Sequence, residues 1–251
     1  MTAWQPVSAC GPACRTGDDA AVGEVRTVLR MVALCGVLLI GLVLVPIFRG
    51  PAIRALARAV LASLGVRLRS RGPAVRGGSL LVANHVSWLD IVVLMAHHPV
   101  RLVAKREVRD WPGIGALAAL SGAIFLDRRR PKALPGTVAQ VAAALRAGRP
   151  VAVFPEGTTF CGPERGQFRP AVLQAAVDAR APIVPVALTY GSTAAAFVGD
   201  DSLWSSVVRV ARLRELTVTL VTAPALHPEV GACRKTLARA AQASASYQPA
   251  A

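Results

Sequence analysis

A histidine and an aspartate, His85 and Asp90, stand five positions apart directly after the apolar run of residues 79–83. A histidine near its ordinary pKa can take a proton from an alcohol. A carboxylate about one helical turn further on can orient the imidazole and stabilise its charged form. The pair therefore predicts general-base chemistry on a hydroxyl group. The alternative is a polar loop whose aspartate caps the following helix.

Three further chemistry-bearing segments also adjoin apolar runs. Asp127-Arg128 follows residues 123–126, Glu156-Gly157 follows residues 151–154, and residues 182–186 follow Ala181. Ligands of α/β sheets gather at the carboxyl ends of strands, so we expect all four segments to meet at one edge. The combination suits attack by an alcohol while an anionic group is held nearby, because arginine binds oxyanions in a two-pronged fashion.

The pattern between residues 66 and 240 predicts an α/β fold, in which helices cover a mixed, mostly parallel sheet. Short apolar runs alternate there with helical periodicity. Strands are predicted at 66–71, 79–83, 100–104, 123–126, 150–154, 183–189 and 216–221, and helices at 88–96, 111–120, 135–146, 170–179, 203–213 and 230–240.

Two helices are expected ahead of this domain. Residues 31–48 carry no charge, which is close to the minimum length for a membrane span. Residues 51–64 form a basic amphipathic pattern suited to an anionic membrane surface. Six arginines within residues 49–71 place the bulk of the chain in the cytoplasm by the positive-inside rule. The alternative for 31–48 is a buried helix of a soluble core.

The composition favours a membrane partner over nucleic acid. The 251 residues have a formal net charge of +15, a hydrophobic fraction of 53% and an aromatic fraction of 5%. Such a charge suits anionic lipids or phosphate-bearing substrates, whereas few aromatic side chains are available to stack on bases. The five cysteines follow no common zinc or redox spacing, and we expect free thiols in a reducing compartment.

The expected organisation has four parts. Residues 1–24 are predicted to be a disordered tail, residues 25–64 a membrane-associating pair of helices, residues 65–242 the catalytic domain, and residues 243–251 a flexible tail. A serine hydrolase is disfavoured, because the chain has no Gly-x-Ser-x-Gly elbow.

Over residues 75–225 the four segments, in this order and at these separations, resemble the conserved blocks of the glycerophospholipid acyltransferase family. Its best-known members are 1-acyl-sn-glycerol-3-phosphate acyltransferases. The first block is the His-x4-Asp pair, and the second is Gly-Ala-Ile-Phe-Leu-Asp-Arg at residues 122–128. The third is Phe-Pro-Glu-Gly-Thr at residues 154–158, and the fourth is Pro-Ile-Val-Pro-Val at residues 182–186.

The resemblance implies an O-acyltransferase that moves an acyl chain from acyl-CoA or acyl carrier protein to a lysolipid hydroxyl, with no cofactor or metal. His85 would be the base and Asp90 would orient it. Head-group binding is assigned, partly from the blocks and partly from nearby basic residues, to Lys105, Arg128, Glu156, Gly157, Thr158, Arg165 and Arg169. The fourth block, through Pro182, Val184 and Pro185, would shape the acyl-donor site.

One departure bears on the acceptor. Many phosphatidate-forming members have an arginine after Glu-Gly-Thr, where this chain has Thr159. We expect 1-acyl-sn-glycerol-3-phosphate as acceptor, with another lysolipid such as lyso-ornithine lipid as the alternative. A non-catalytic, membrane-bound protein that holds anionic lipid is the alternative of another class. In each case the domain is expected on the cytoplasmic face of the membrane.

Overall fold

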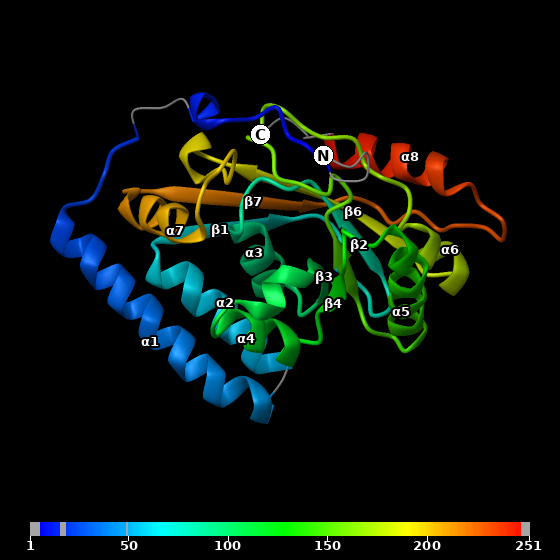
Figure 1. Cartoon of the computed structure of the whole chain (residues 1–251), viewed down its shortest axis with the longest axis horizontal. Helices are drawn as coiled ribbons and strands as arrows, with labels where there is room; N and C mark the ends of the chain where they lie inside the picture. The colour runs from blue at the N-terminus through cyan, green and yellow to red at the C-terminus, as the bar shows by residue number, and fades with distance from the viewer. Residues whose placement is uncertain (1–5, 16–18, 49, 247–251) are drawn as a thin grey trace.

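A seven-stranded sheet forms the centre of the computed structural model, which describes residues 6–15, 19–48 and 50–246 (Figure 1). The strand order is β1-β7-β6-β2-β5-β3-β4, and every neighbouring pair is parallel except β6 and β7. The strands are β1 (Val66–Arg71), β2 (Leu80–Ala83), β3 (Arg101–Lys105), β4 (Ile124–Leu126), β5 (Val151–Val153), β6 (Ile183–Tyr190) and β7 (Leu216–Thr222). The prediction of a mixed, mostly parallel sheet is confirmed.

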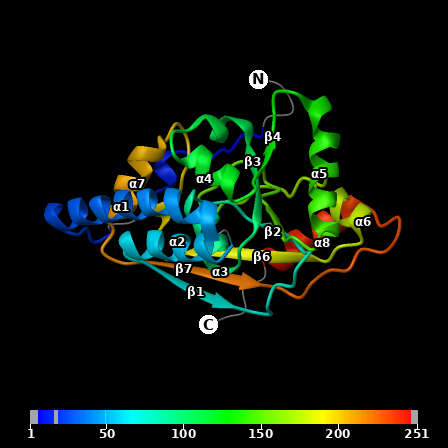
Figure 2. The ribbon, with the colours of Figure 1, turned by 90° about the horizontal axis from the view of Figure 1, so that it is seen from below.

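Helices cover both faces of the sheet, as the buried apolar strands require. The α-helices are α1 (Glu24–Phe48), α2 (Gly50–Ser63), α3 (Leu89–His97), α4 (Ile114–Leu120), α5 (Leu134–Arg146), α6 (Gln174–Ala179), α7 (Leu203–Arg212) and α8 (Arg234–Ser246). Short 3-10 helices lie at Pro12–Cys14, Arg106–Asp110, Pro131–Ala133 and Thr193–Ala195. Figures 1 and 2 show α1 and α2 together on one side of the molecule and α5, α6 and α8 on the other.

The core is divided by the sheet into two apolar clusters. In β2, Leu81 and Ala83 face the cluster built with α2, α3 and α7, whereas Leu80 and Val82 face the cluster built with α5, α6 and α8. This alternation is the two-residue period of a strand that is buried on both faces. The central strand β2 is thereby held rigidly, and the loop that follows it starts from a fixed point.

Helix α1 packs against the domain along one stripe and leaves the rest of its surface exposed. Its buried residues, which include Leu34, Gly41 and Val45, recur at helical spacing toward the domain. It packs mainly against α2, and a Cβ at Gly41 would lie 2.7 Å from the Leu56 side chain. The helix is long and apolar enough to cross a membrane, with 17% of its most apolar window buried.

The prediction of a disordered tail over residues 1–24 is wrong for the residues that the structure describes there. Cys10 is buried, Arg15 pairs with Asp201 at 3.2 Å, and residues 20–22 form backbone hydrogen bonds with Arg212 and Arg214. The sequence shows no periodicity here because the segment follows the surface as a loop. Likewise, residues 243–246 belong to α8 and not to a tail, while residues 247–251 lie outside the described residues.

Candidate active site

The first polar segment begins at the carboxyl end of the central strand β2. His85 lies in the loop after this strand, and Asp90 lies in the first turn of α3. The His85 Nδ1 and an Asp90 Oδ atom are 2.8 Å apart. The strand sets the position of the histidine and the helix sets that of the aspartate, so the pair is held by two elements of the core.

Asp90 is fully buried and accepts hydrogen bonds through both carboxylate oxygens. Oδ2 accepts from His85 and from the backbone N–H groups of Val86 and Ser87, at 2.6 and 2.9 Å, while Oδ1 accepts from the Tyr190 hydroxyl. Asp90 does not cap α3, whose N-cap is Trp88 with no side-chain cap hydrogen bond; its carboxylate instead binds His85 and two backbone N–H groups of the loop ahead of the helix. A carboxylate with four donors is fixed in place and has its burial offset.

The imidazole of His85 is oriented by a second side chain. Its ring stacks on Phe154 with a centroid distance of 4.0 Å and an interplanar angle of 13°. Because Nδ1 donates to Asp90, Nε2 is the nitrogen with a lone pair, and the side chain retains 19% exposure. An imidazole held in this way can serve as a general base toward a hydroxyl that approaches Nε2.

Glu156 supports the same histidine from its backbone. Its carboxylate accepts hydrogen bonds from the N–H groups of His85 at 2.6 Å and Gly166 at 3.0 Å, and the residue is 4% exposed. Burial, aided by the nearby Asp90, raises the pKa of Glu156 to about 7 against the opposing effect of these hydrogen bonds. Both oxygens of Glu156 thus bind backbone groups inside the domain, and contact with the acceptor stays a prediction.

Cationic side chains gather beside this loop. Arg128, which follows β4, donates to the carbonyl of Gly157, and the Arg169 side chain lies within 3.9 Å of the place that a Cβ on Gly157 would take. Burial lowers the pKa of Arg128, Glu107 opposes this shift, and Arg169 lowers the pKa further. Desolvation together with the neighbouring Arg128 lowers the pKa of Lys105. Neighbouring positive charges repel one another, and a bound anion relieves this repulsion.

Gly157 has a φ of +77°, a conformation that glycine adopts without strain, so the turn after β5 needs a glycine here. Thr158 is half-buried in the same turn. Arg165 is turned elsewhere: its Nε donates to the Gly162 carbonyl and its Nη1 to that of Ala245, at 3.4 and 3.5 Å. Of these two arginines, Arg169 is the one whose side chain lies beside the Gly157 turn.

The fourth segment does not join the other three at the carboxyl edge, which corrects the expectation from sequence. Val184 pairs with Leu81 and Pro185 with Val82, so the segment runs inside the sheet beside the body of β2. The backbone carbonyl of Pro182 accepts from Leu80 at the start of that strand. The segment therefore lies at the start of β6 and not after the end of a strand. Its role in the acyl-donor site stays a prediction.

Sequence reasoning overlooked Tyr190 and Phe154, the two aromatic residues that hold the pair. Tyr190 ends β6 and Phe154 follows β5, so both stand at carboxyl ends of strands parallel to β2. The rule that drew attention to the polar segments applies to them equally. They escaped notice because an aromatic residue at the end of an apolar run is usually a core residue.

Fold and site together define a class of protein: an α/β enzyme with a histidine held by a buried aspartate beside a cluster of cations. The sequence profile of the Acyltransferase family matches residues 65–189, which include the histidine, the aspartate and the third block. The chain belongs to this acyltransferase family, and it is an O-acyltransferase.

Named relatives agree with this assignment. A 1-acyl-sn-glycerol-3-phosphate acyltransferase of Neisseria meningitidis serogroup B is 34% identical over 180 residues, which cover 69% of this chain and 71% of that protein. A lyso-ornithine lipid O-acyltransferase of Pseudomonas aeruginosa is 37% identical over 187 residues, covering 72% and 71%. The crystal structure of the 1-acyl-sn-glycerophosphate acyltransferase from Thermotoga maritima has the same fold, with a TM-score of 0.57, 19% identity, and coverage of 90% of this chain and 99% of that one.

Proposed function

We propose that the chain acylates the free hydroxyl of 1-acyl-sn-glycerol-3-phosphate and so forms phosphatidate. The choice of acceptor rests on the cluster of cations formed by Lys105, Arg128 and Arg169 beside the loop that holds His85. A phosphate monoester carries close to two negative charges at neutral pH, which suits several cations better than a zwitterionic head group does.

The proposed reaction is a direct transfer from an acyl thioester, either acyl-CoA or acyl carrier protein. Nε2 of His85 takes the proton of the acceptor hydroxyl as its oxygen attacks the thioester carbonyl. The carbon–oxygen bond forms, the carbon–sulfur bond breaks, and the proton passes from the imidazolium to the departing thiolate. Asp90, held by its four donors, stabilises the imidazolium between these steps.

Lyso-ornithine lipid is the second candidate acceptor, and one observation favours it. The Thr159 hydroxyl, at the position of the missing arginine, donates to the carbonyl of Phe197. This position therefore serves the protein's own backbone and supplies no charge to a phosphate. A relative named for the acylation of lyso-ornithine lipid is among those that match this chain.

The experiment that separates the acceptors measures thiol release from acyl-CoA and from acyl carrier protein, with each lysolipid, in purified full-length protein. We expect turnover with 1-acyl-sn-glycerol-3-phosphate, and an Arg128→Gln variant should raise its KM by about 10- to 100-fold, the effect of losing one charge-assisted contact. Arg129→Gln is the matched control, because Arg129 is exposed and pairs with Glu107. Turnover with lyso-ornithine lipid alone would reject the phosphate acceptor.

We propose further that α1 holds the domain on the cytoplasmic face of the membrane, with its exposed face in one leaflet. That face is apolar, with exposed Val28, Leu39, Ile40, Val43 and Ile47. The opposite stripe rests on the domain, so the helix has a membrane-facing side and a protein-facing side. The anionic head groups of that leaflet would also meet the basic flank of α2.

A double substitution on the exposed face tests this anchoring without opening the core. Ile40→Glu with Val43→Glu should release the protein from vesicles that contain anionic lipid, as measured by flotation. Val230→Glu is the control, because Val230 is as exposed but lies in a loop away from α1. Unchanged flotation of the double variant would contradict the anchoring role of α1.

A further inference from the structure

Three cysteine thiols meet behind the loop that holds His85. Cys10 and Cys14 come from the N-terminal segment and Cys161 comes from the loop after β5, about 150 residues away in sequence. Their three Sγ atoms lie within 4.8 Å of one another, and those of Cys10 and Cys161 are 3.4 Å apart. The spacing of Cys10 and Cys14 alone did not indicate a metal site, because the fold brings in the third thiol.

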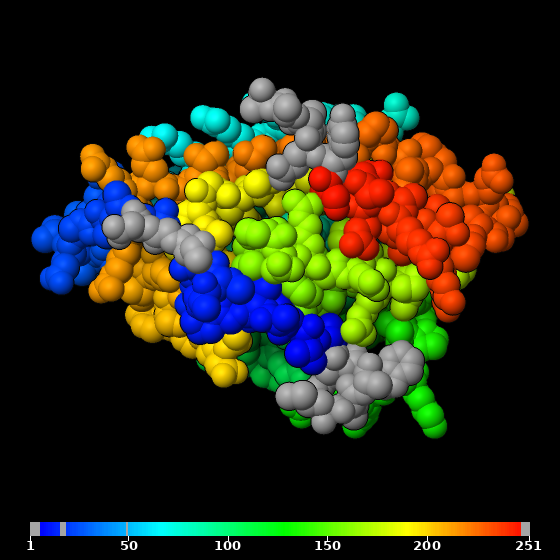
Figure 3. All heavy atoms as spheres, turned by 90° about the horizontal axis from the view of Figure 1, so that it is seen from above, coloured from blue at the N-terminus to red at the C-terminus, as the bar shows by residue number. Residues whose placement is uncertain are grey.

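Local structure brings the thiols to one point. The 3-10 turn over Pro12–Cys14, closed by a 3.0 Å hydrogen bond from the Cys14 N–H to the Gly11 carbonyl, folds the two N-terminal cysteines toward each other. The backbone N–H of Cys161 points at the Cys10 sulfur, 3.3 Å away. Such N–H···S contacts stabilise thiolate charge, as the outer contacts of a metal site do. Figure 3 shows this segment as the blue band lying along the surface of the domain.

We propose that Cys10, Cys14 and Cys161 bind one thiophilic metal ion, Zn²⁺ being the first candidate. Zinc–thiolate bonds of about 2.3 Å in tetrahedral geometry place ligand sulfur atoms about 3.8 Å apart. The sulfur separations here, 3.4 Å for one pair and at most 4.8 Å for the others, bracket that value. A disulfide would use only two of the thiols, whereas a metal ion accounts for all three.

A water molecule would complete the coordination. Among the residues that the structure describes, no further histidine, cysteine or carboxylate belongs to the group. Three protein ligands and a water molecule give an open zinc site, but two of the three cysteines are buried. The ion would therefore be structural, with its binding energy contributing to the folded arrangement of this region.

The ion site would be connected to the active site by direct packing contacts. The cysteines pack in one cluster with Val86, whose backbone N–H holds Asp90, and against Tyr190, whose hydroxyl does the same. The same segment carries Pro6, which lies over Gly157: a Cβ on this glycine would be 2.8 Å from the Pro6 ring. Metal binding would thus fix the N-terminal segment against the turn that carries Gly157.

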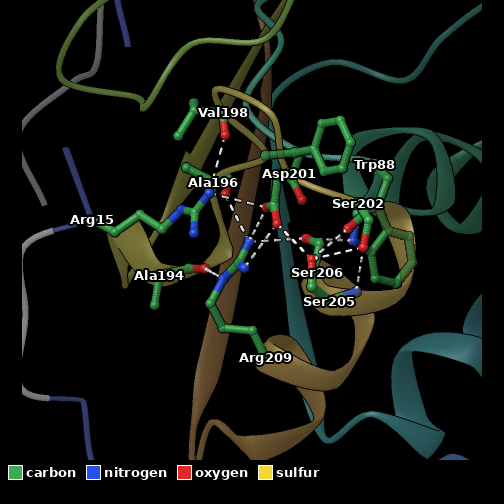
Figure 4. A network of polar contacts seen from close by, with 12 residues as sticks. Arg15, Trp88, Ala194, Ala196, Val198, Asp201, Ser202, Ser205, Ser206 and Arg209 are labelled. Carbon is green, nitrogen blue, oxygen red and sulfur yellow. Dashed lines mark hydrogen bonds and ion pairs between the residues drawn. The ribbon is translucent and has the colours of Figure 1, made fainter. Parts of the chain in front are cut away.

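A second anchor holds the segment independently of the ion. Arg15 pairs with Asp201 and donates to the Val198 carbonyl at 3.1 Å, and Asp201 also binds Arg209 (Figure 4). The network extends to Ser206, which accepts from the Trp88 indole at 3.2 Å. Because this anchor lies past the cysteines, single Cys→Ser variants should keep the segment in place and remain folded.

Metal content and thiol counting test the proposal, and neither depends on the acyl acceptor. Full-length protein purified in detergent with zinc in the medium should contain one zinc ion per chain by elemental analysis. Cys14→Ser, at the half-buried ligand, should lose at least nine-tenths of it, as should Cys10→Ser and Cys161→Ser. Cys35→Ser and Cys233→Ser are the controls, because both of these cysteines are exposed and outside the cluster.

A thiol reagent separates metal from disulfide in the wild-type protein itself. With zinc bound, two thiols per chain should react rapidly, and a chelator should raise the number to the full five. Three reactive thiols that become five only with a reductant, together with a Cys10–Cys161 peptide linkage in the mass spectrum, would overturn the proposal in favour of a disulfide. Five reactive thiols without a chelator would also overturn it.

Discussion

Asp90→Asn isolates the charge of the aspartate from its structural contacts. The amide oxygen can still accept from the N–H groups of Val86 and Ser87, and the amide NH₂ can turn toward the Tyr190 oxygen. The substitution therefore keeps the loop and removes the negative charge beside the imidazolium. Thermal unfolding should shift by only a few degrees.

The magnitude follows from the distance between the two side chains. At an effective dielectric constant of about 20, unit charges separated by the 2.8 Å between Nδ1 and Oδ2 attract by about 6 kcal/mol. A transition state with half of the proton charge transferred would lose about 3 kcal/mol, or about 10²-fold in rate, and full transfer would lose about 10⁴-fold. We expect kcat to fall within this range with little change in KM for either substrate.

The assay is steady-state thiol release under saturating acceptor, with circular dichroism to confirm the fold. A folded Asp90→Asn protein with a kcat within about threefold of wild type would refute the electrostatic reasoning, because no arrangement of a neutral amide supplies that stabilisation. Loss of the fold would instead show that the hydrogen bonds of Asp90 to the loop before α3 dominate.

Two further predictions concern the groups that surround the pair. Because the pKa of Glu156 is raised to about 7 from 4.5, its stabilising effect is full below pH 4.5 and is lost as pH rises through 7. Over this interval the free energy of unfolding of the wild type should fall by roughly 3 kcal/mol relative to that of Glu156→Gln. The same pH dependence of unfolding free energy in the two proteins would contradict this. Tyr190→Phe should lower kcat by about tenfold but cost little on top of Asp90→Asn, and additive losses in this double-mutant cycle would show that the hydroxyl acts elsewhere.

Alternation of apolar runs and helical periodicity was sufficient to predict the sheet and its covering helices. Strand β1 has the predicted bounds, and the other strands begin and end within two residues of theirs. Such elements are local, and each is specified by its own residues. The His85–Asp90 pair was predictable for the same reason, because five positions across a strand end and a helix start leave little freedom.

Contacts between distant segments were not predictable from local patterns. Tyr190 meets Asp90 because β6 lies beside β2 in the sheet, and Cys161 meets Cys10 because the N-terminal segment lies across the loop after β5. The N-terminal segment has no periodicity, yet it lies against the domain through a few polar and thiol contacts. The direction of the Glu156 side chain was also missed, because an acidic residue after a strand serves the backbone as readily as a ligand.

The role of His85 as the base of acyl transfer is tested most directly by one comparison. Thiol release from acyl-CoA and acyl carrier protein should be measured for wild type and His85→Ala, with 1-acyl-sn-glycerol-3-phosphate as acceptor and product formation followed by mass spectrometry. Phosphatidate formation should fall by at least about 10²-fold in the folded variant. Equal rates in the two proteins, with either donor, would contradict it.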